Sequence, residues 1–225
     1  TAYMAGMSLQ ENLEGIAKPR FVFLMLFNTT GALFSLVQFV AFFGPLVGVI
    51  LGFDAINRER AHGTLIKLVS QPIYRDAVIN GKFLAGVTTI SIMLVAIVLV
   101  VSGFGLTLLG IVPGTEEVLR LVFYLVISIF SISLWLGISI LFSIIFKSIT
   151  TSALASLALW IFLSFFISLG ADILAGAIAP VDRREGANHE QILKNARIRE
   201  RISLFSPMPL YSKASDLLVN PMTNT

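Results

Sequence analysis

Cysteine is absent from this chain of 225 residues, and only 13% of the residues are charged, about half the share that is usual in soluble domains. The lack of cysteine excludes a disulfide scaffold and a thiolate-bound metal site, and it leaves the redox compartment undecided. The charged residues are also spread unevenly. Four stretches contain none of them, namely residues 21–53, 83–115, 121–146 and 148–171. This distribution excludes a soluble globular enzyme and a disordered chain.

The four uncharged stretches predict membrane-spanning helices. A hydrocarbon core of about 30 Å requires roughly 20 apolar residues in a helix, and each stretch supplies them. Residues 92–101 read IMLVAIVLVV and are apolar on every face, whereas a membrane β-strand alternates in polarity. We therefore predict an all-α, multi-pass transmembrane helix bundle that forms a single domain over residues 1–225. Its spans lie near residues 32–52, 83–109, 121–146 and 152–170.

The segments between the spans contain the charges. Residues 54–82 form a polar loop and residues 179–225 a polar tail, and four spans place these two segments on opposite sides of the membrane. The loop side carries six Lys and Arg residues and the tail side ten. Most of that excess lies in the long tail, where the positive-inside rule is weak, so charge alone leaves the orientation open. The net charge of +3 suits an anionic bilayer surface and gives no indication of nucleic-acid binding.

The chain also lacks the residues that catalysis or ion coupling would require. The four predicted spans contain no Asp, Glu, Lys, Arg or His, which counts against a proton relay and an intramembrane metalloprotease. His62 and His189 lie in segments on opposite sides of the membrane, so they do not bind one metal ion. No GxSxG nucleophile motif and no GxxxxGK[ST] phosphate loop occurs. We therefore expect no catalytic residue, no metal site and no ATP-binding site in this chain.

Small residues recur within the first and third predicted spans. Gly44, Gly48 and Gly52 stand at every fourth position, a spacing that lets another helix approach closely, and they are our candidate helix-packing residues. They form either a face on which helices slide during a transport cycle or a static contact. The serines of the third span either line a polar path or bond back to their own helix. These serines are Ser128, Ser131, Ser133, Ser139 and Ser143.

The 54–82 loop contains the signals of a short amphipathic helix. Residues 57–60 predict a charged helical turn, and Gly63-Thr64 interrupts it and caps the helix that follows. Pro72 stops that helix, because proline disfavours helical backbone in the residue before it. The chain then re-enters helix with Asp76 in its first turn. The short helix either rests in the lipid headgroups or is held by a soluble partner.

A long motif extends from the end of the first span to the start of the second. Phe53-Asp54-Ala55-Ile56 is followed by the pattern xxERxxGTLxxLxSQPIxRxxVxxGKFLA. This motif resembles the membrane subunits of ATP-binding-cassette (ABC) transporters of the type-2 permease family, in its multicopper-reductase-maturation and sodium-export-like branch. In the tail, Ser206-Pro207 and Tyr211-Ser212 resemble the stretch before that family's last membrane helix.

The resemblance implies a permease subunit that couples ATP hydrolysis by a separate ABC ATP-binding subunit to transport, with export as the direction. It implies a multi-pass protein of the cell membrane that pairs with a second copy or a homologous half. The 54–82 loop would be cytoplasmic and would dock on the ATP-binding subunit, and residues 179–225 would be extracytoplasmic. ATP and Mg would be bound by the partner, and no cofactor by this chain. The candidate partner-binding residues are Arg58, Glu59, Arg60, Gly63, Thr64, Leu65, Gln71, Pro72 and Arg75.

The same family has six spans, one before the first span predicted here and one after the tail. We therefore expect this chain to be the middle of a longer permease. A second class of function stays open at this point, a non-transporting membrane anchor or assembly subunit that holds an extracytoplasmic partner through residues 179–225. Co-purification with an ATPase distinguishes the two.

Overall fold

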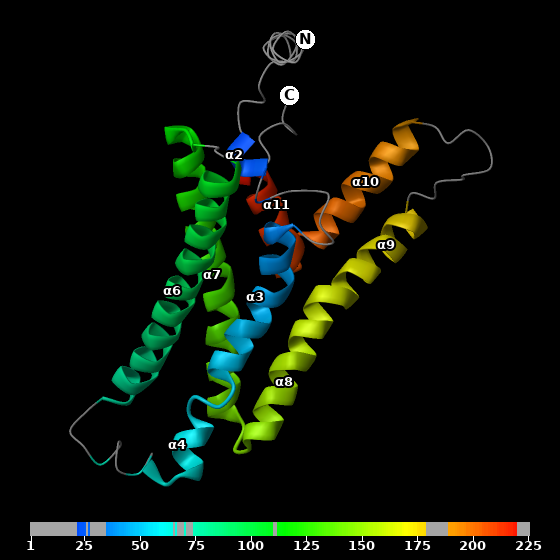
Figure 1. Ribbon diagram of the computed structural model, residues 1–225. Coiled ribbons are helices and arrows are strands. Elements are labelled where there is room, and N and C mark those ends of the chain that lie inside the picture. The colour runs from blue at the N-terminus through cyan, green and yellow to red at the C-terminus, as the bar shows by residue number, and fades with distance from the viewer. Residues whose placement is uncertain are drawn as a thin grey trace.

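The computed structural model describes residues 22–25, 27, 35–64, 66, 70, 74–109, 112–178 and 189–219. All regular secondary structure in these ranges is helical, so the predicted all-α class is confirmed (Figure 1). In chain order the elements are α2 (Val22–Met25), α3 (Leu36–Gly52), α4 (Asn57–Ala61), α6 (Arg75–Leu109), α7 (Thr115–Ile145), α8 (Ile149–Ile161), the π-helical η1 (Phe162–Phe166), α9 (Ile167–Ile178), α10 (His189–Ser203) and α11 (Pro207–Val219).

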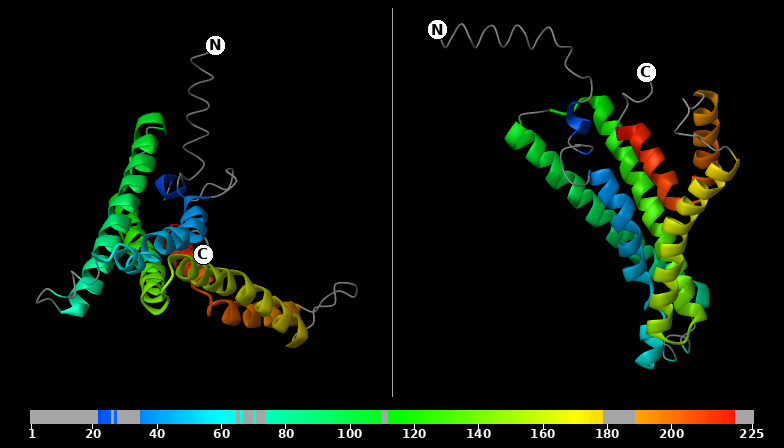
Figure 2. Two further views of the ribbon diagram at one scale, coloured as in Figure 1. Left: turned by 90° about the horizontal axis from the view of Figure 1, so that it is seen from below. Right: turned by 90° about the vertical axis from the view of Figure 1, so that its right-hand side faces the viewer.

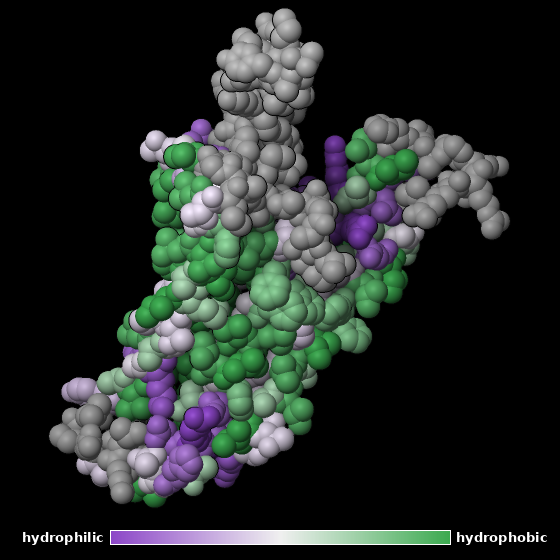
Figure 3. All heavy atoms as spheres, in the orientation of Figure 1, coloured by the Kyte–Doolittle hydropathy of each residue, from purple (hydrophilic) through white to green (hydrophobic). Residues whose placement is uncertain are grey.

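Four helical segments of the described chain are long and apolar enough to cross a membrane, as expected for a multi-pass bundle. They are Leu36–Ala61, Asp76–Thr107, Thr115–Ile145 and Ile149–Ile178, each of 26 to 32 residues. Hydrophobic residues form a broad band over the middle of the face shown in Figure 3. Hydrophilic residues gather at its lower end, around α4 and the start of α6, and beside α10.

Two helices start earlier than the uncharged stretches that predicted them. α6 begins at Arg75 and α7 at Thr115, because their first turns carry the acidic residues Asp76, Glu116 and Glu117. Acidic side chains are favourable at a helix N-terminus, where the backbone N–H groups lack partners. Glu117 accepts a hydrogen bond from the Gly114 N–H at 2.8 Å and another from the Phe23 N–H at 3.0 Å. A charged first turn therefore belongs to the helix although it lies outside the uncharged stretch.

α7 is the central helix of the bundle. α3, α6, α8 and α11 all pack against it, and its residues Tyr124, Ile132, Leu136 and Ile140 are buried in the main hydrophobic core. Seen from below in Figure 2, α6 and the continuous α8–η1–α9 helix diverge from a centre formed by α3 and α7. The loop that contains α4 lies at the lower end of this bundle in Figure 1.

The polar tail folds back into the bundle instead of remaining outside it. α10 packs along α9, and α11 packs against α7 and α3, which buries Tyr211 and Val219 in the main core. Ser206, at the tip between the two helices, is fully buried, and its hydroxyl donates to the Leu163 carbonyl of η1 at 2.7 Å. Pro207 then opens α11, a position that proline favours because its missing N–H needs no partner there. A segment that composition alone marks as polar thus contributes part of the core.

Candidate functional site

The candidate site is the α4 segment, which is fixed to α7 by one serine. The Ser143 Oγ accepts hydrogen bonds from the backbone N–H groups of Ile56 and Asn57, both at 3.1 Å. Ser143 is fully buried and Asn57 is 2% exposed. The first N–H groups of a helix have no partner within that helix. A side chain from another helix, more than 80 residues away in the sequence, therefore caps α4.

Two side chains of α4 join it to the turn between α7 and α8. The Asn57 Nδ2 donates to the Ser148 carbonyl at 3.4 Å. An Arg60 guanidinium nitrogen donates to the Phe146 carbonyl at 3.3 Å and to the Asn57 Oδ1 at 3.1 Å. These carbonyls lie beyond the last turn of α7, where backbone acceptors have few partners, and a cation is favourable there. α4 is therefore held on the connection between two candidate membrane spans.

Glu59 joins α4 to the start of α6. The Lys82 Nζ donates to its Oε1 at 2.9 Å, and the Thr64 hydroxyl donates to its Oε2 and, at 3.2 Å, to its backbone carbonyl. The Lys82 and Glu59 side chains are 29% and 27% exposed. An ion pair in contact with solvent contributes at most about 1 kcal/mol, so its main effect is to fix position. The loop is thereby closed between the segment that leaves α3 and the segment that enters α6.

The remaining predicted partner-binding residues differ in how far the structure defines them. Arg58 forms an ion pair with Asp54 at 2.5 Å and keeps its side chain 67% exposed. Gly63 adopts a positive φ of 70°, and a Cβ added there would have no atom within 4 Å. Arg75 opens α6, with its side chain outside the described set. Leu65, Gln71 and Pro72 lie outside the described residues.

The face of the loop that points away from the bundle is open to a partner. Arg58, Arg60 and His62 are exposed on it, and so are two large apolar side chains, Ile66 at 78% and Tyr74 at 86%. Exposed cations beside exposed aromatic and aliphatic side chains are the composition that protein interfaces favour. The α4 segment thus has one face hydrogen-bonded to the span ends and another face free to bind.

The sequence reasoning did not assign Ser143, Asn57 or Ser148 to this site. Ser143 was expected either to line a polar path or to bond back to its own helix, and it does neither. Two other serines of α7 are also committed to helix contacts: Ser128 bonds the Tyr124 carbonyl and the Tyr211 hydroxyl, and Ser139 bonds the Val49 carbonyl of α3 and Ser156 of α8. The signal available in the sequence was only their presence on one helix, because hydroxyl partners depend on which helix lies alongside.

The three candidate packing glycines of α3 face the backbone of α7. A Cβ added at Gly48 would lie 2.6 Å from the Ile132 carbonyl oxygen, and one at Gly52 would lie 2.8 Å from the Leu136 carbonyl oxygen. At Gly44 the nearest atoms are those of the Ile132 side chain, at 2.9 Å. The contact between α3 and α7 is thus closer than any residue with a side chain allows. Below it, α4 is fixed to the same helix by Ser143.

Within the described ranges, no three His, Cys, Asp or Glu side chains lie close enough to hold a metal ion. The comparisons with known proteins concern the whole chain. Residues 2–224 match a family model described as "ABC-2 family transporter protein". A relative from Pseudomonas aeruginosa, named "Probable ABC transporter permease protein NosY", is 34% identical over 90 residues. The matched stretch is 39% of this chain and 30% of that protein, so the chain spans less than a third of the relative's length. No solved structure matches.

Proposed function

The chain belongs to the ABC-2 family of transporter proteins, and from that premise we propose that it is the permease subunit through which a separate ATP-binding subunit drives transport. Its membership and its four apolar helices make it a membrane subunit of an ABC transporter. The finer proposal concerns the α4 segment. We propose that α4 is the cytoplasmic contact with the ATP-binding subunit and that residues 179–225 are extracytoplasmic.

The attachment of α4 to several helices is the observation that supports this proposal. α4 follows α3 directly, Ser143 fixes it to α7, Asn57 and Arg60 fix it to the α7–α8 turn, and Glu59 fixes it to Lys82 of α6. A displacement of α4 therefore moves the lower ends of four long helices together. A loop that only rested in lipid headgroups would gain nothing from hydrogen bonds to buried serine and to helix-end carbonyls.

The mechanism proposed for this geometry is a rigid-body one. ATP and Mg bound by the partner would close the partner subunits and push on the exposed face of α4. Because the glycines of α3 lie against the backbone of α7, these two helices would move as one body. A second copy of the permease or a homologous half would complete the pathway, and export is the direction that the loop motif's resemblance to exporters favours. This chain supplies the transmission, and the partner supplies the chemistry.

Gly63 allows a test of the loop without altering any side-chain contact. Its φ of +70° is unavailable to proline, whose ring fixes φ near −65°, whereas asparagine tolerates the left-handed region. We expect Gly63→Pro to lower permease-stimulated ATP hydrolysis of the reconstituted transporter about tenfold or more, which corresponds to roughly 1.4 kcal/mol. Gly63→Asn is the matched control and should keep the stimulation within about twofold, since nothing lies within 4 Å of the added Cβ.

The measurement is ATP hydrolysis by the complex in lipid vesicles, with helix content and membrane insertion recorded for both variants. Full stimulation in a correctly inserted Gly63→Pro variant would show that α4 does not dock on the ATP-binding subunit. If the wild-type chain co-purifies with no ATP-hydrolysing subunit, the anchor function replaces the transport function.

A further inference from the structure

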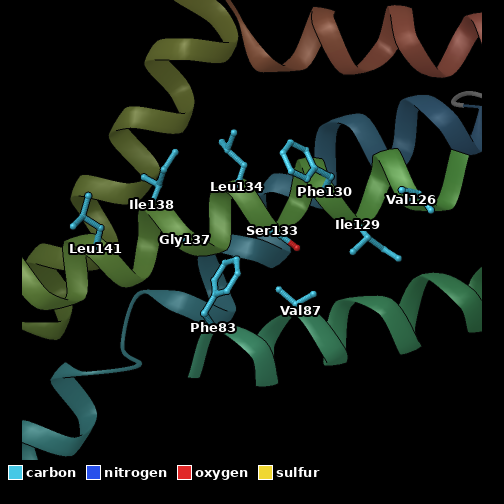
Figure 4. A pocket seen from close by; sticks show the side chains of 10 residues that line it. All are labelled: Phe83, Val87, Val126, Ile129, Phe130, Ser133, Leu134, Gly137, Ile138 and Leu141. Atoms are coloured by element: carbon cyan, nitrogen blue, oxygen red, sulfur yellow. The ribbon is translucent and has the colours of Figure 1, made fainter. Parts of the chain in front are cut away.

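A long groove opens between α6 and α7, on the opposite side of α7 from the glycine contact. Its volume is about 760 Å³, and it extends along α7 from Val126 to Leu141, about 22 Å at 1.5 Å per residue. Figure 4 shows the lining side chains of α7, with Phe83 and Val87 of α6 forming the other wall. The full lining is Phe83, Val87, Val126, Ile129, Phe130, Ser133, Leu134, Gly137, Ile138 and Leu141.

Ser133 is the one residue of this lining that carries a polar side chain, and its hydroxyl has no hydrogen-bond partner among the described residues. The residue is 8% exposed, so the hydroxyl is held away from bulk water. In Figure 4 its oxygen points from α7 into the space beside α6. An unpaired buried hydroxyl in an apolar surrounding is unfavourable, so a ligand that bonds it gains free energy.

The other hydroxyls of these helices show that Ser133 differs from its neighbours. Several Ser and Thr residues donate to the carbonyl four residues earlier on their own helix, as serine commonly does in membrane helices. Examples are Thr88, Ser91, Ser128, Ser156 and Ser168. Ser133 forms no such bond to Ile129. Its hydroxyl is thus oriented for a partner outside its own helix.

The size of the groove indicates which class of partner it accepts. A helix about 10 Å across and 22 Å long occupies roughly 1,700 Å³, more than twice the groove volume. The groove volume lies within the range of about 300–1,000 Å³ that is typical of small-molecule sites. Because the chain is a membrane subunit, the molecules that meet an apolar groove on its spans are those dissolved in the bilayer.

We propose that the α6–α7 groove binds a single-chain amphiphile, a molecule of fatty-acid or isoprenoid type whose carbonyl or hydroxyl group near mid-chain hydrogen-bonds to Ser133. The chain would lie along the groove from Leu141 to Val126, and Gly137 leaves the floor open beneath it. Phe83 follows Lys82 directly, so the lower end of the groove lies next to a lysine at the charged end of the bundle. An acidic headgroup at that end would be favoured by this cation.

The test compares two probes that differ only in the group that faces Ser133. They are stearic acid and an oxostearic acid with its ketone near mid-chain, bound to the intact transporter complex and quantified by native mass spectrometry. The wild-type complex should bind the ketone about three- to tenfold more tightly than stearic acid, the range of one hydrogen bond. Ser133→Ala should abolish that preference, and the matched control Ser91→Ala, which removes a hydroxyl bonded to its own helix, should keep it.

A second variant tests the place of the chain itself. Gly137→Leu projects a side chain into the groove and should weaken the binding of both probes at least about tenfold, without changing helix content. Equal binding of the two probes to the wild type, or a ketone preference that survives Ser133→Ala, would overturn the proposal. So would a protein cross-link: a cysteine placed by Leu134→Cys is unique in this chain, and its capture by another helix would show that the groove is a helix interface. None of these readouts depends on ATP hydrolysis, so they fail or succeed independently of the coupling function.

Discussion

The two faces of α7 are built in different ways. Towards α3, glycines bring backbone against backbone, with added Cβ atoms 2.6–2.9 Å from α7. Towards α6, the close contact is between Gly86 and the Leu136 side chain, and the rest of the interface opens into the groove. In the most apolar stretch of each span, 44% of the α3 residues are buried but only 17% of the α6 residues. A backbone contact cannot yield without separating the helices, whereas a side chain can change rotamer. The first face therefore transmits displacement and the second permits it.

The strongest test of this difference is Gly48→Ala on α3. The new methyl group would lie 2.6 Å from the Ile132 carbonyl oxygen and 3.0 Å from the Leu136 nitrogen, and neither backbone atom can move alone. Overpacking of this kind costs about 1–3 kcal/mol, and we expect a clearly lower midpoint of thermal denaturation in detergent. Gly103→Ala on α6, where no atom lies within 4 Å of the added Cβ, is the control. An unchanged midpoint for Gly48→Ala would contradict the rigid contact between α3 and α7.

Gly137→Ala on the groove side of α7 should have an effect of the opposite sign. The nearest atom to its added Cβ is the Phe83 ring at 3.6 Å, an ordinary van der Waals distance. Alanine is favoured over glycine within a helix by about 0.5–1 kcal/mol, so the variant should be slightly more stable than the wild type. The same denaturation measurement checks this. A loss of stability would show that the groove is already filled by protein.

Gly86→Ala should show the smallest effect of the three. Its added Cβ would lie 2.5 Å from a methyl group of Leu136, as close as the contact at Gly48, but the neighbour is the end of a flexible side chain. Moving Leu136 costs about 0.5–1.5 kcal/mol, and the gain in helix preference of about 0.5–1 kcal/mol offsets most of it. We expect a change within about 0.5 kcal/mol of zero for the sum of these terms. A destabilisation equal to that of Gly48→Ala would remove the distinction between the two faces.

Much of this organisation could be predicted from particular residues. The glycine spacing at positions 44, 48 and 52 indicated a close helix contact, and in the structure all three face α7. Gly63 was assigned to the loop motif, and it is the described residue with a positive φ. The positions of Ser143 and Ser206 could not be predicted, because each bonds a backbone group of a segment distant in the sequence. A hydroxyl pattern on one helix contains no information about the helix that will lie next to it.

By itself the sequence determined that long stretches of this chain form membrane-spanning helices. Uncharged apolar segments enter lipid, and in lipid only a helix or a closed barrel pairs every backbone N–H and C=O group. Only the tertiary structure decided which helix meets which. It placed α4 on Ser143, folded α11 of the polar tail into the core, and left the Ser133 hydroxyl facing an open groove. These outcomes depend on contacts between segments far apart in the chain, and such contacts form only when the packing of the whole bundle brings the two groups within hydrogen-bond distance.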